Sequence, residues 1–323
     1  MRIVDFLKKL VGFRNPDELE AASSASLQKK YSSAWYSLLH TKEGLAGVAL
    51  ISVFLTWSFV EGLLQLVGLF IGRPSVGWVL LPHDPIVAPN PSASLLPPSP
   101  RYPFGTNFSG QDILSRLLYA APLDAAAAVV VVSSAVIIGA LLGMTAGYFG
   151  GWMDEALMRL TDAFLAFPAI ILAIAISMLM GNGFNSLLIS LCVVWWPAYA
   201  RLFRGETLTI RYRGFVEVSK LYGLNDAKIL FKHVFMNAID PVLAFVALDF
   251  GGVILTYSSL AFLGIGIQPP YPEWGSMASN SLNFFPTAWW YTFFPSLAIL
   301  MVVIGFVFVG DSLQEQLLGG GIL

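Results

Sequence analysis

The sequence is poor in charge, cysteine and histidine. Only 12% of its 323 residues are charged, and its one cysteine, Cys192, excludes a disulfide framework within the chain. No GxxxxGK[ST] phosphate loop occurs, so we do not expect the chain itself to be an ATPase. The three histidines, His40, His83 and His233, are far apart in sequence, and we expect no metal site. The net charge of −2 gives no reason to expect a nucleic-acid partner.

Apolar residues, in contrast, are abundant. They make up 56% of the chain, and the mean hydropathy is +0.72, which is more apolar surface than a soluble core of this length can bury. Apolar runs recur that approach the roughly 20 residues needed to cross a bilayer. We predict an all-α polytopic membrane protein with six transmembrane helices, at 46–71, 122–148, 168–180, 186–200, 241–267 and 289–310, the third and fourth extended at their ends.

Lysine and arginine are distributed unevenly about these spans. They cluster before the first span and between the fourth and fifth, whereas the opposite side carries only Arg73, Arg101 and Arg116. Because cytoplasmic loops are enriched in positive charge, we predict a multi-pass protein of the cell (plasma) membrane with both termini in the cytoplasm. The N-terminus shows no cleavable signal peptide, so the first span is expected to act as the insertion signal.

The regions outside the spans differ in character. We expect a cytoplasmic N-terminal segment at 1–45, the first transmembrane helix at 46–71, a proline-rich extracellular strap at 72–104, a core transmembrane domain at 105–317 and a short tail at 318–323. Proline disfavours helix, so the strap is predicted to be extended. The N-terminal segment either lies as an amphipathic helix on the inner membrane surface, followed by a helix opened by Asn15 and Pro16, or is a disordered tail.

The stretch EVSKLYGLNDAKILFKHVFMNAIDP, residues 217–241, is polar although apolar runs flank it. We predict a short helix over 213–222, ended by Gly223 in the left-handed conformation. Its apolar face would be formed by Phe215, Val218, Leu221 and Tyr222. This helix either rests on the bilayer or protrudes into a pocket on a cytoplasmic partner.

Cap signals continue along the same loop. Asn225 or Asp226 is predicted to cap a second helix, because short polar side chains accept hydrogen bonds from free N–H groups of a first turn. Asp240 followed by Pro241 is predicted to open the fifth span in the same way.

Glu217, Gly223 and the run KHVFMNA resemble the EAA loop of permease subunits in binding-protein-dependent ABC importers. YPFGTNFSGQDILSRLLY, GYFGGWMDEALMRLTDAFLAFP, WPAYARLFRGE and SLAFLGIGIQPPYPEWGSM follow one another as in the peptide and nickel permease family, over about 35–317, and the last is similar to the C-type signature. The chain departs from the family at Asn107 and Gln111, usually Asp and Arg, and at Pro122, usually Arg. These positions bear on the substrate or the docking partner and not on the fold.

The resemblance implies a type I ABC importer fold and a subunit without bond chemistry, so we do not expect an enzyme. Its expected partners are a homologous B-type permease, two ATP-binding subunits, an extracellular solute-binding protein and membrane lipid. No cofactor is expected on this chain, since ATP and Mg would bind the ATP-binding subunits. The loop at about 201–240 would couple ATP hydrolysis to transport through Arg213, Phe215, Glu217, Val218, Lys220, Leu221, Tyr222 and Gly223. For Arg213 and Lys220 the alternative is a solvated, positive-inside face.

Several residues within the spans are candidates for the transport pathway, namely Trp195, Trp196, Tyr257, Ser258 and Ser259. Alternatively, the tryptophans lie at the bilayer interface and the serines bond to helix backbone. Family relatives carry peptides, oligosaccharides or nickel, and we expect oligopeptides or oligosaccharides. A self-sufficient secondary carrier or channel is the alternative, although neither internal repeats nor charges at the membrane midplane are evident.

Charged residues near the membrane are expected to be structural. Arg159 is predicted to pair with Glu155 or Asp162 at helical spacing, close to Asp154 at the inner boundary. Glu61 lies inside the first span, where an acidic residue is expensive, and we predict a packing or interfacial role for it.

Overall fold

The computed structural model describes residues 38–87, 91–181 and 183–318, and its long elements are all helices. The tail beyond 318 and most of the N-terminal segment, including the predicted Asn15 and Pro16 cap, lie outside the described residues. In chain order the elements are α3 (Lys42–Phe70), η1 (Pro74–Trp78), η2 (Pro91–Ala93), α4 (Ile113–Phe149), α5 (Gly151–Leu165), α6 (Ala169–Met180), α7 (Phe184–Ile210), α8 (Gly214–Leu221), α9 (Asp226–Lys228), η3 (Ile229–Val234), α10 (Phe235–Phe262), α11 (Trp274–Ser281), η4 (Leu282–Phe284) and α12 (Trp289–Leu318).

Helix length and composition confirm an all-α polytopic membrane protein. Five helices of the described chain are long and apolar enough to cross a membrane, and a sixth span results if α5 and α6 count as one. The predicted third span at 168–180, extended at its ends, corresponds to α6, which has 12 residues and is long enough to cross only together with α5, from which it is bent by 86°. Pro168 lies at this bend, since proline disfavours helical geometry in the residue before it.

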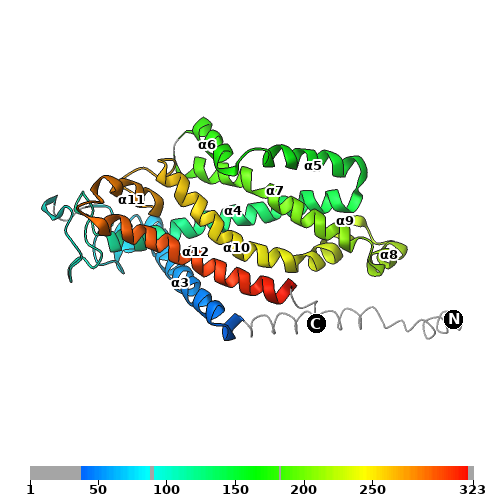
Figure 1. Cartoon of the computed structure of the whole chain (residues 1–323), viewed down its shortest axis with the longest axis horizontal. Coiled ribbons are helices and arrows are strands. Elements are labelled where there is room, and N and C mark those ends of the chain that lie inside the picture. The colour runs from blue at the N-terminus through cyan, green and yellow to red at the C-terminus, as the bar shows by residue number, and fades with distance from the viewer. Residues whose placement is uncertain (1–37, 88–90, 182, 319–323) are drawn as a thin grey trace.

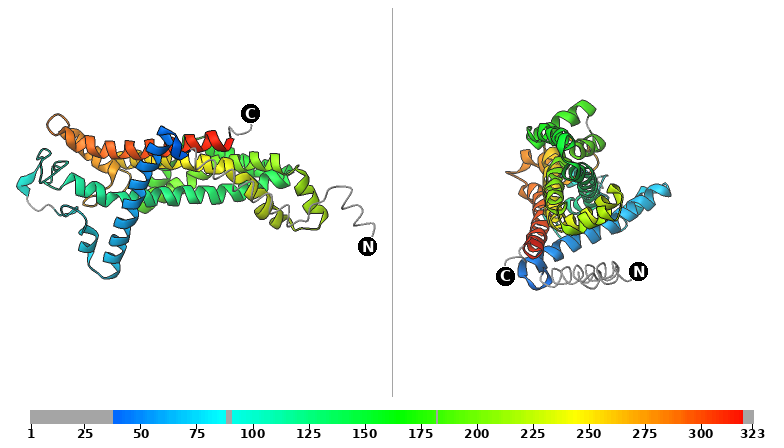
Figure 2. Two further views of the ribbon diagram at one scale, coloured as in Figure 1. Left: turned by 90° about the horizontal axis from the view of Figure 1, so that it is seen from below. Right: turned by 90° about the vertical axis from the view of Figure 1, so that its right-hand side faces the viewer.

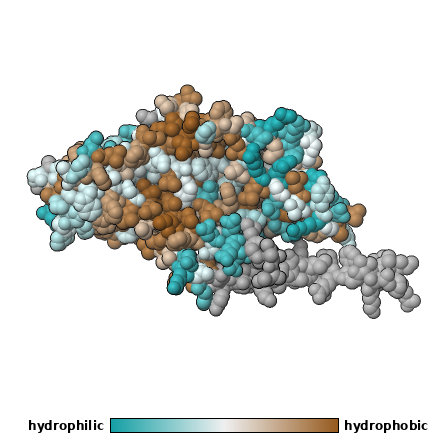
Figure 3. Space-filling view, viewed as in Figure 1, coloured by the Kyte–Doolittle hydropathy of each residue, from teal (hydrophilic) through white to brown (hydrophobic). Residues whose placement is uncertain are grey.

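The long helices α4, α7, α10 and α12 run lengthwise beside one another, and α3 crosses them obliquely (Figures 1 and 2). α8 lies at one end of this bundle, which we call the loop end. α11 and the described residues of the strap (72–87 and 91–104) lie at the other, the strap end. In the face shown in Figure 3, apolar side chains gather over the middle of the bundle, where a membrane would surround it.

Three glycines, one per helical turn, bring α4 directly against α7. A Cβ at Gly139 would lie 2.4 Å from the Tyr199 Cβ, and one at Gly143 only 2.3 Å from the Ala200 carbonyl oxygen. At Gly147 the distance to the Thr207 Cβ would be 2.8 Å. Such contacts are closer than any side chain permits, so glycine sets the separation of the two helices.

The second span begins earlier than predicted. Asp112 caps α4 by accepting a hydrogen bond from the Ser115 N–H at 3.0 Å, so the predicted start at Pro122 lies inside the helix. Proline has no N–H to offer the Leu118 carbonyl one turn back. The Trp57 indole N–H of α3 donates to that oxygen instead, at 2.9 Å. Because this donor from α3 satisfies the carbonyl that the proline leaves free, proline is compatible with the interior of α4. The sequence alone does not show such a partner.

The predicted start of the fifth span at Asp240 and Pro241 is also wrong. α10 begins at Phe235, directly after the π-helical η3, and Pro241 lies within its second turn. The helix ends at Phe262, before the predicted 267, because Gly264 turns the chain with a φ of +88°. The start was misplaced because proline is compatible with the early turns of a helix as well as with its first residue.

The two residues of α5 for which a pair was predicted, Arg159 and Asp162, both form ion pairs, but not with each other. Arg159 bonds to Glu155 at 2.7 Å, one of the two predicted partners. Asp162 instead pairs with Arg201, also at 2.7 Å, which joins α5 to α7. Glu61 is fully buried and accepts a hydrogen bond from Gln65 at 3.0 Å, within the contact between α3 and α4.

Candidate functional site

The loop-end helix α8 ends where its sequence predicts. Arg213 precedes it in an extended conformation and Tyr222 ends it. Gly223 has a φ of +73°, and the N–H groups of Gly223 and Leu224 return to the carbonyls of Lys220 and Ser219 at 2.9 and 3.2 Å. This pair of bonds closes the last turn of α8 and needs the left-handed conformation that glycine adopts without strain.

α8 buries one side and presents the other. Val216 is fully buried and packs into the main hydrophobic core, an anchor that the predicted apolar face omitted. Leu221 and Tyr222 are 86% and 73% exposed. Phe215 is 37% exposed and lies beside the ring of His233. Glu217 is exposed and Val218 half-buried, so the predicted coupling residues mostly face away from the bundle.

Side-chain contacts tie α8 to the end of α4. The Lys220 ammonium lies 4.6 Å from the centre of the Tyr148 ring, a cation–π distance. The Tyr148 hydroxyl donates to Asp226 at 2.6 Å, immediately after the α8 turn. Arg211 donates to the Gly147 carbonyl at 2.8 Å. Contacts at both ends of α8 therefore hold this helix against α4.

The five pathway candidates do not form one cluster. Trp196 is buried against Phe164, Tyr257 is fully buried, and Ser258 is only 3% exposed. The Ser259 hydroxyl donates to the Leu255 carbonyl in its own helix at 2.6 Å, the alternative noted for such serines. Trp195 differs from these four because its indole N–H donates to the Asp249 carboxylate at 2.7 Å.

Asp249 was missed by the sequence analysis, which found no charge at the midplane. The Tyr199 hydroxyl also donates to Asp249, at 2.7 Å, so two donors of α7 hold one carboxylate of α10. A single acidic residue in the run AFVALDFGGVIL was the available signal. Intramembrane carboxylates are rare enough to be functional candidates by default.

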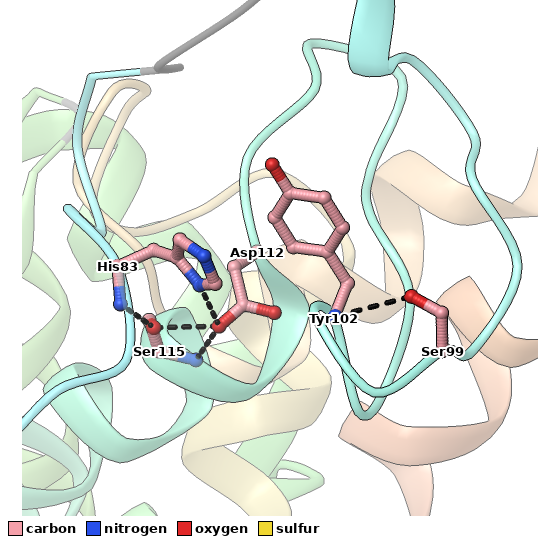
Figure 4. A network of polar contacts seen from close by, with 5 residues as sticks. All are labelled: His83, Ser99, Tyr102, Asp112 and Ser115. Carbon is pink, nitrogen blue, oxygen red and sulfur yellow. Dashed lines mark hydrogen bonds and ion pairs between the residues drawn. The ribbon is translucent and has the colours of Figure 1, made fainter.

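At the strap end, the first turn of α4 fixes the strap (Figure 4). The His83 backbone N–H donates to the Ser115 hydroxyl at 2.9 Å, and Ser115 donates to Asp112 at 2.6 Å. The His83 Nδ1 lies 3.4 Å from the same carboxylate, with the Tyr102 ring beside it. Because Ser115 bonds to the aspartate and not to the imidazole, these residues are not a nucleophilic triad. Among the residues described, no group of three or more His, Cys, Asp or Glu could hold a metal ion.

The departures from the family motif also lie here. The Asn107 amide donates to the Gln111 carbonyl oxygen at 2.8 Å, so these two residues form a neutral pair. Next to them, Arg116 is 7% exposed and donates to the carbonyls of Pro85 and Pro270 at 2.7 and 3.1 Å. The Arg116 guanidinium therefore joins α4 to the strap and to the turn that contains Pro270.

Glu273 caps α11 from inside the protein. Its carboxylate accepts the Gly275 and Ser276 N–H groups at 2.8 and 2.7 Å, yet the side chain is fully buried. Burial raises the pKa of the Glu273 carboxyl to about 7. The residue is consequently protonated in part near neutral pH.

We expect the stability of the chain to fall as pH rises from about 4.5 towards 7. The folded state keeps the Glu273 proton over this interval whereas the unfolded state releases it, which corresponds to roughly 3 kcal/mol at most. Thermal unfolding in mild detergent at pH 5 and pH 8 measures the effect. Glu273→Gln should flatten the pH dependence, and Glu315→Gln, at an exposed position of α12, should leave it unchanged. If stability depends on pH equally in both variants, Glu273 is not the group responsible.

Apolar helices long enough to cross a membrane and an anchored helix that protrudes at one end of the bundle are the features of a polytopic membrane subunit. Residues 139–318 match the family described as binding-protein-dependent transport system inner membrane component. The chain belongs to this family of ABC importer permeases, in its C-type peptide branch, and is a non-catalytic subunit.

Three relatives illustrate the similarity. The dipeptide transport system permease protein DppC of Alkalihalophilus pseudofirmus is 39% identical over 238 residues, which cover 74% of this chain and 78% of the relative. The glutathione transport system permease protein GsiD of Pectobacterium atrosepticum is 38% identical over 220 residues, 68% and 73% of the two chains. The probable D,D-dipeptide transport system permease protein DdpC of Escherichia coli K12 is 36% identical over 238 residues, 74% and 80% of the two.

Proposed function

We propose that this chain is the permease subunit of an importer for small peptides, driven by separate ATPase subunits that dock on α8. The observation that carries the proposal is the form of α8, which is anchored through Val216 and Tyr148 and exposes Leu221 and Tyr222. An exposed leucine and an exposed aromatic ring on a braced helix suit a groove on a partner. A rigid seat is also what transmission of ATPase closure requires, because a loose connection would absorb the movement.

The orientation and the partners follow from the same proposal. The loop end, rich in lysine and arginine, faces the cytoplasm together with both termini, and the strap end faces the solute-binding protein. A homologous B-type permease completes the pathway, and ATP and Mg bind the ATPase subunits. The names of the relatives favour peptides over oligosaccharides, the other substrate class expected from the sequence.

Single-cysteine cross-linking tests the docking of α8. Cys192 is the one cysteine of the chain, so a Cys192→Ser background leaves a thiol introduced by Leu221→Cys as the sole reactive site. In membranes containing the whole importer, we expect this thiol to cross-link to an ATPase subunit. The same background with Val79→Cys, an exposed position 71% accessible in the strap, should not. If the thiol at position 79 cross-links to an ATPase subunit and the thiol at position 221 does not, the proposed orientation is wrong.

ATP-dependent uptake of dipeptides into vesicles containing the importer tests the transport function. The proposal requires uptake that needs both ATP and the solute-binding protein. Uptake by the purified chain alone, without ATP, would support the carrier alternative instead.

A further inference from the structure

Asp249 lies near the middle of the membrane-spanning part of the chain. It follows Phe235, the first residue of α10, by 14 residues and precedes Phe262, the last, by 13. At a rise of about 1.5 Å per residue, the carboxylate is roughly 20 Å from either end of the helix. Trp195 and Tyr199, its partners, lie midway along α7. No simple interfacial role explains a carboxylate at this depth.

The carboxylate is held but not neutralised. Its Oδ2 accepts the Trp195 N–H and the Tyr199 hydroxyl, both uncharged donors, at 2.7 Å each. No ion pair in the described part of the chain includes Asp249. Neutral donors position a carboxylate without cancelling its charge, so neither of these two donors offsets the charge of the ionised form.

The second oxygen is open. Asp249 is half-buried, and Oδ1 is not among the enclosed polar atoms that lack a partner, so it reaches the surface of the bundle. Gly252, one turn further along α10, keeps the approach clear, since the atom nearest to a Cβ there would be Oδ1 at 3.7 Å. A carboxylate oxygen facing acyl chains costs about 2.5–3.5 kcal/mol, so we take this side to face water.

The geometry points to Asp249 as a subsite for a cationic group of the transported substrate, the α-ammonium of a peptide, with the half-buried Trp195 indole beside it. This inference rests on the proposed function, because it assumes that the open side of α10 lines the peptide pathway. A carboxylate oxygen accepts a charge-assisted bond from an ammonium group. The indole ring adds cation–π attraction for the same group.

The first experiment measures water access and charge without relying on transport. In the whole importer, Gly252→Cys in the Cys192→Ser background is treated with a cationic and an anionic methanethiosulfonate reagent. We expect faster reaction with the cationic reagent, and a loss of this preference by about tenfold when Asp249→Asn is added. Asp311→Asn, at an exposed position near the end of α12, should preserve the preference. No reaction with either reagent, or a preference that Asp249→Asn leaves intact, overturns the inference.

The second experiment measures dipeptide uptake by the importer. An asparagine oxygen accepts the same two hydrogen bonds, so Asp249→Asn keeps the contact between α7 and α10 and removes only the charge. We expect kcat/KM for a dipeptide with a free amino group to fall about tenfold, with assembly of the complex intact. Loss of assembly would show instead that Asp249 pairs with a cation of the partner permease. If the native importer moves no peptide, the proposed function and the peptide subsite fail, while the reagent preference stands as a separate result.

Discussion

Gly143→Ala is expected to leave little folded protein, although it adds one methyl group. The added Cβ would lie 2.3 Å from the Ala200 carbonyl oxygen and 2.9 Å from the Phe203 Cβ. Both neighbours are fully buried in α7, so neither can move aside without separating the helices. We expect destabilisation at or above the upper end of the roughly 1–3 kcal/mol typical of overpacked cores.

The matched control is the same substitution at Gly205 of α7. No atom lies within 4 Å of a Cβ at that position. Alanine there should be neutral or stabilising by up to about 1 kcal/mol, because glycine weakens a helix interior. The yield of monodisperse protein in detergent and the melting temperature report both outcomes. If the two variants melt together, close packing of α4 against α7 is not the reason for glycine at 143.

Leu221→Asp is expected to uncouple the importer without unfolding this chain. The side chain is 86% exposed, so its replacement should change the free energy of unfolding by less than about 0.5 kcal/mol. If Leu221 fills a pocket on an ATPase, a buried carboxylate there should weaken docking by at least about 2 kcal/mol, roughly 30-fold. ATP-dependent uptake should fall accordingly.

Ala227→Asp provides the control for Leu221→Asp, because it introduces the same charge at an exposed position on the neighbouring α9. An acidic residue in the first turn of a helix is favourable, so this variant should fold normally. Co-purification of the ATPase subunits and uptake are measured for both. Full uptake with Leu221→Asp would remove α8 from the coupling role, whereas loss with both variants would indicate a general sensitivity of the loop to negative charge.

Sequence reasoning succeeded where the physics is local. The end of α8 at Gly223 and the cap by Asn225 depend on residues within one turn, and both are confirmed. The pairing of Asp249 could not be deduced, although the residue itself could be noticed, because its two donors are 54 and 50 residues away. The start of α4 was misplaced because a partner 61 residues distant, Trp57, satisfies the carbonyl freed by Pro122.

Two features of the sequence were not used in the predictions. The spacing of Gly139, Gly143 and Gly147 is the pattern of small residues at every fourth position that predicts close helix contact in membranes. Val216 was left out of the predicted apolar face, because a short helix has few turns in which to distinguish its buried face from its exposed face.

The Arg116 junction also has a consequence during synthesis of the chain. One of its two acceptors, the Pro270 carbonyl, is 154 residues further along. At a typical elongation rate of about 5–20 residues per second, that acceptor leaves the ribosome roughly 8–30 s after the arginine. Until then the guanidinium must be accommodated by water, lipid headgroups or an assembly factor. The strap end therefore closes late, and a nascent chain that stalls before Pro270 lacks one of the two carbonyls that hold Arg116 there.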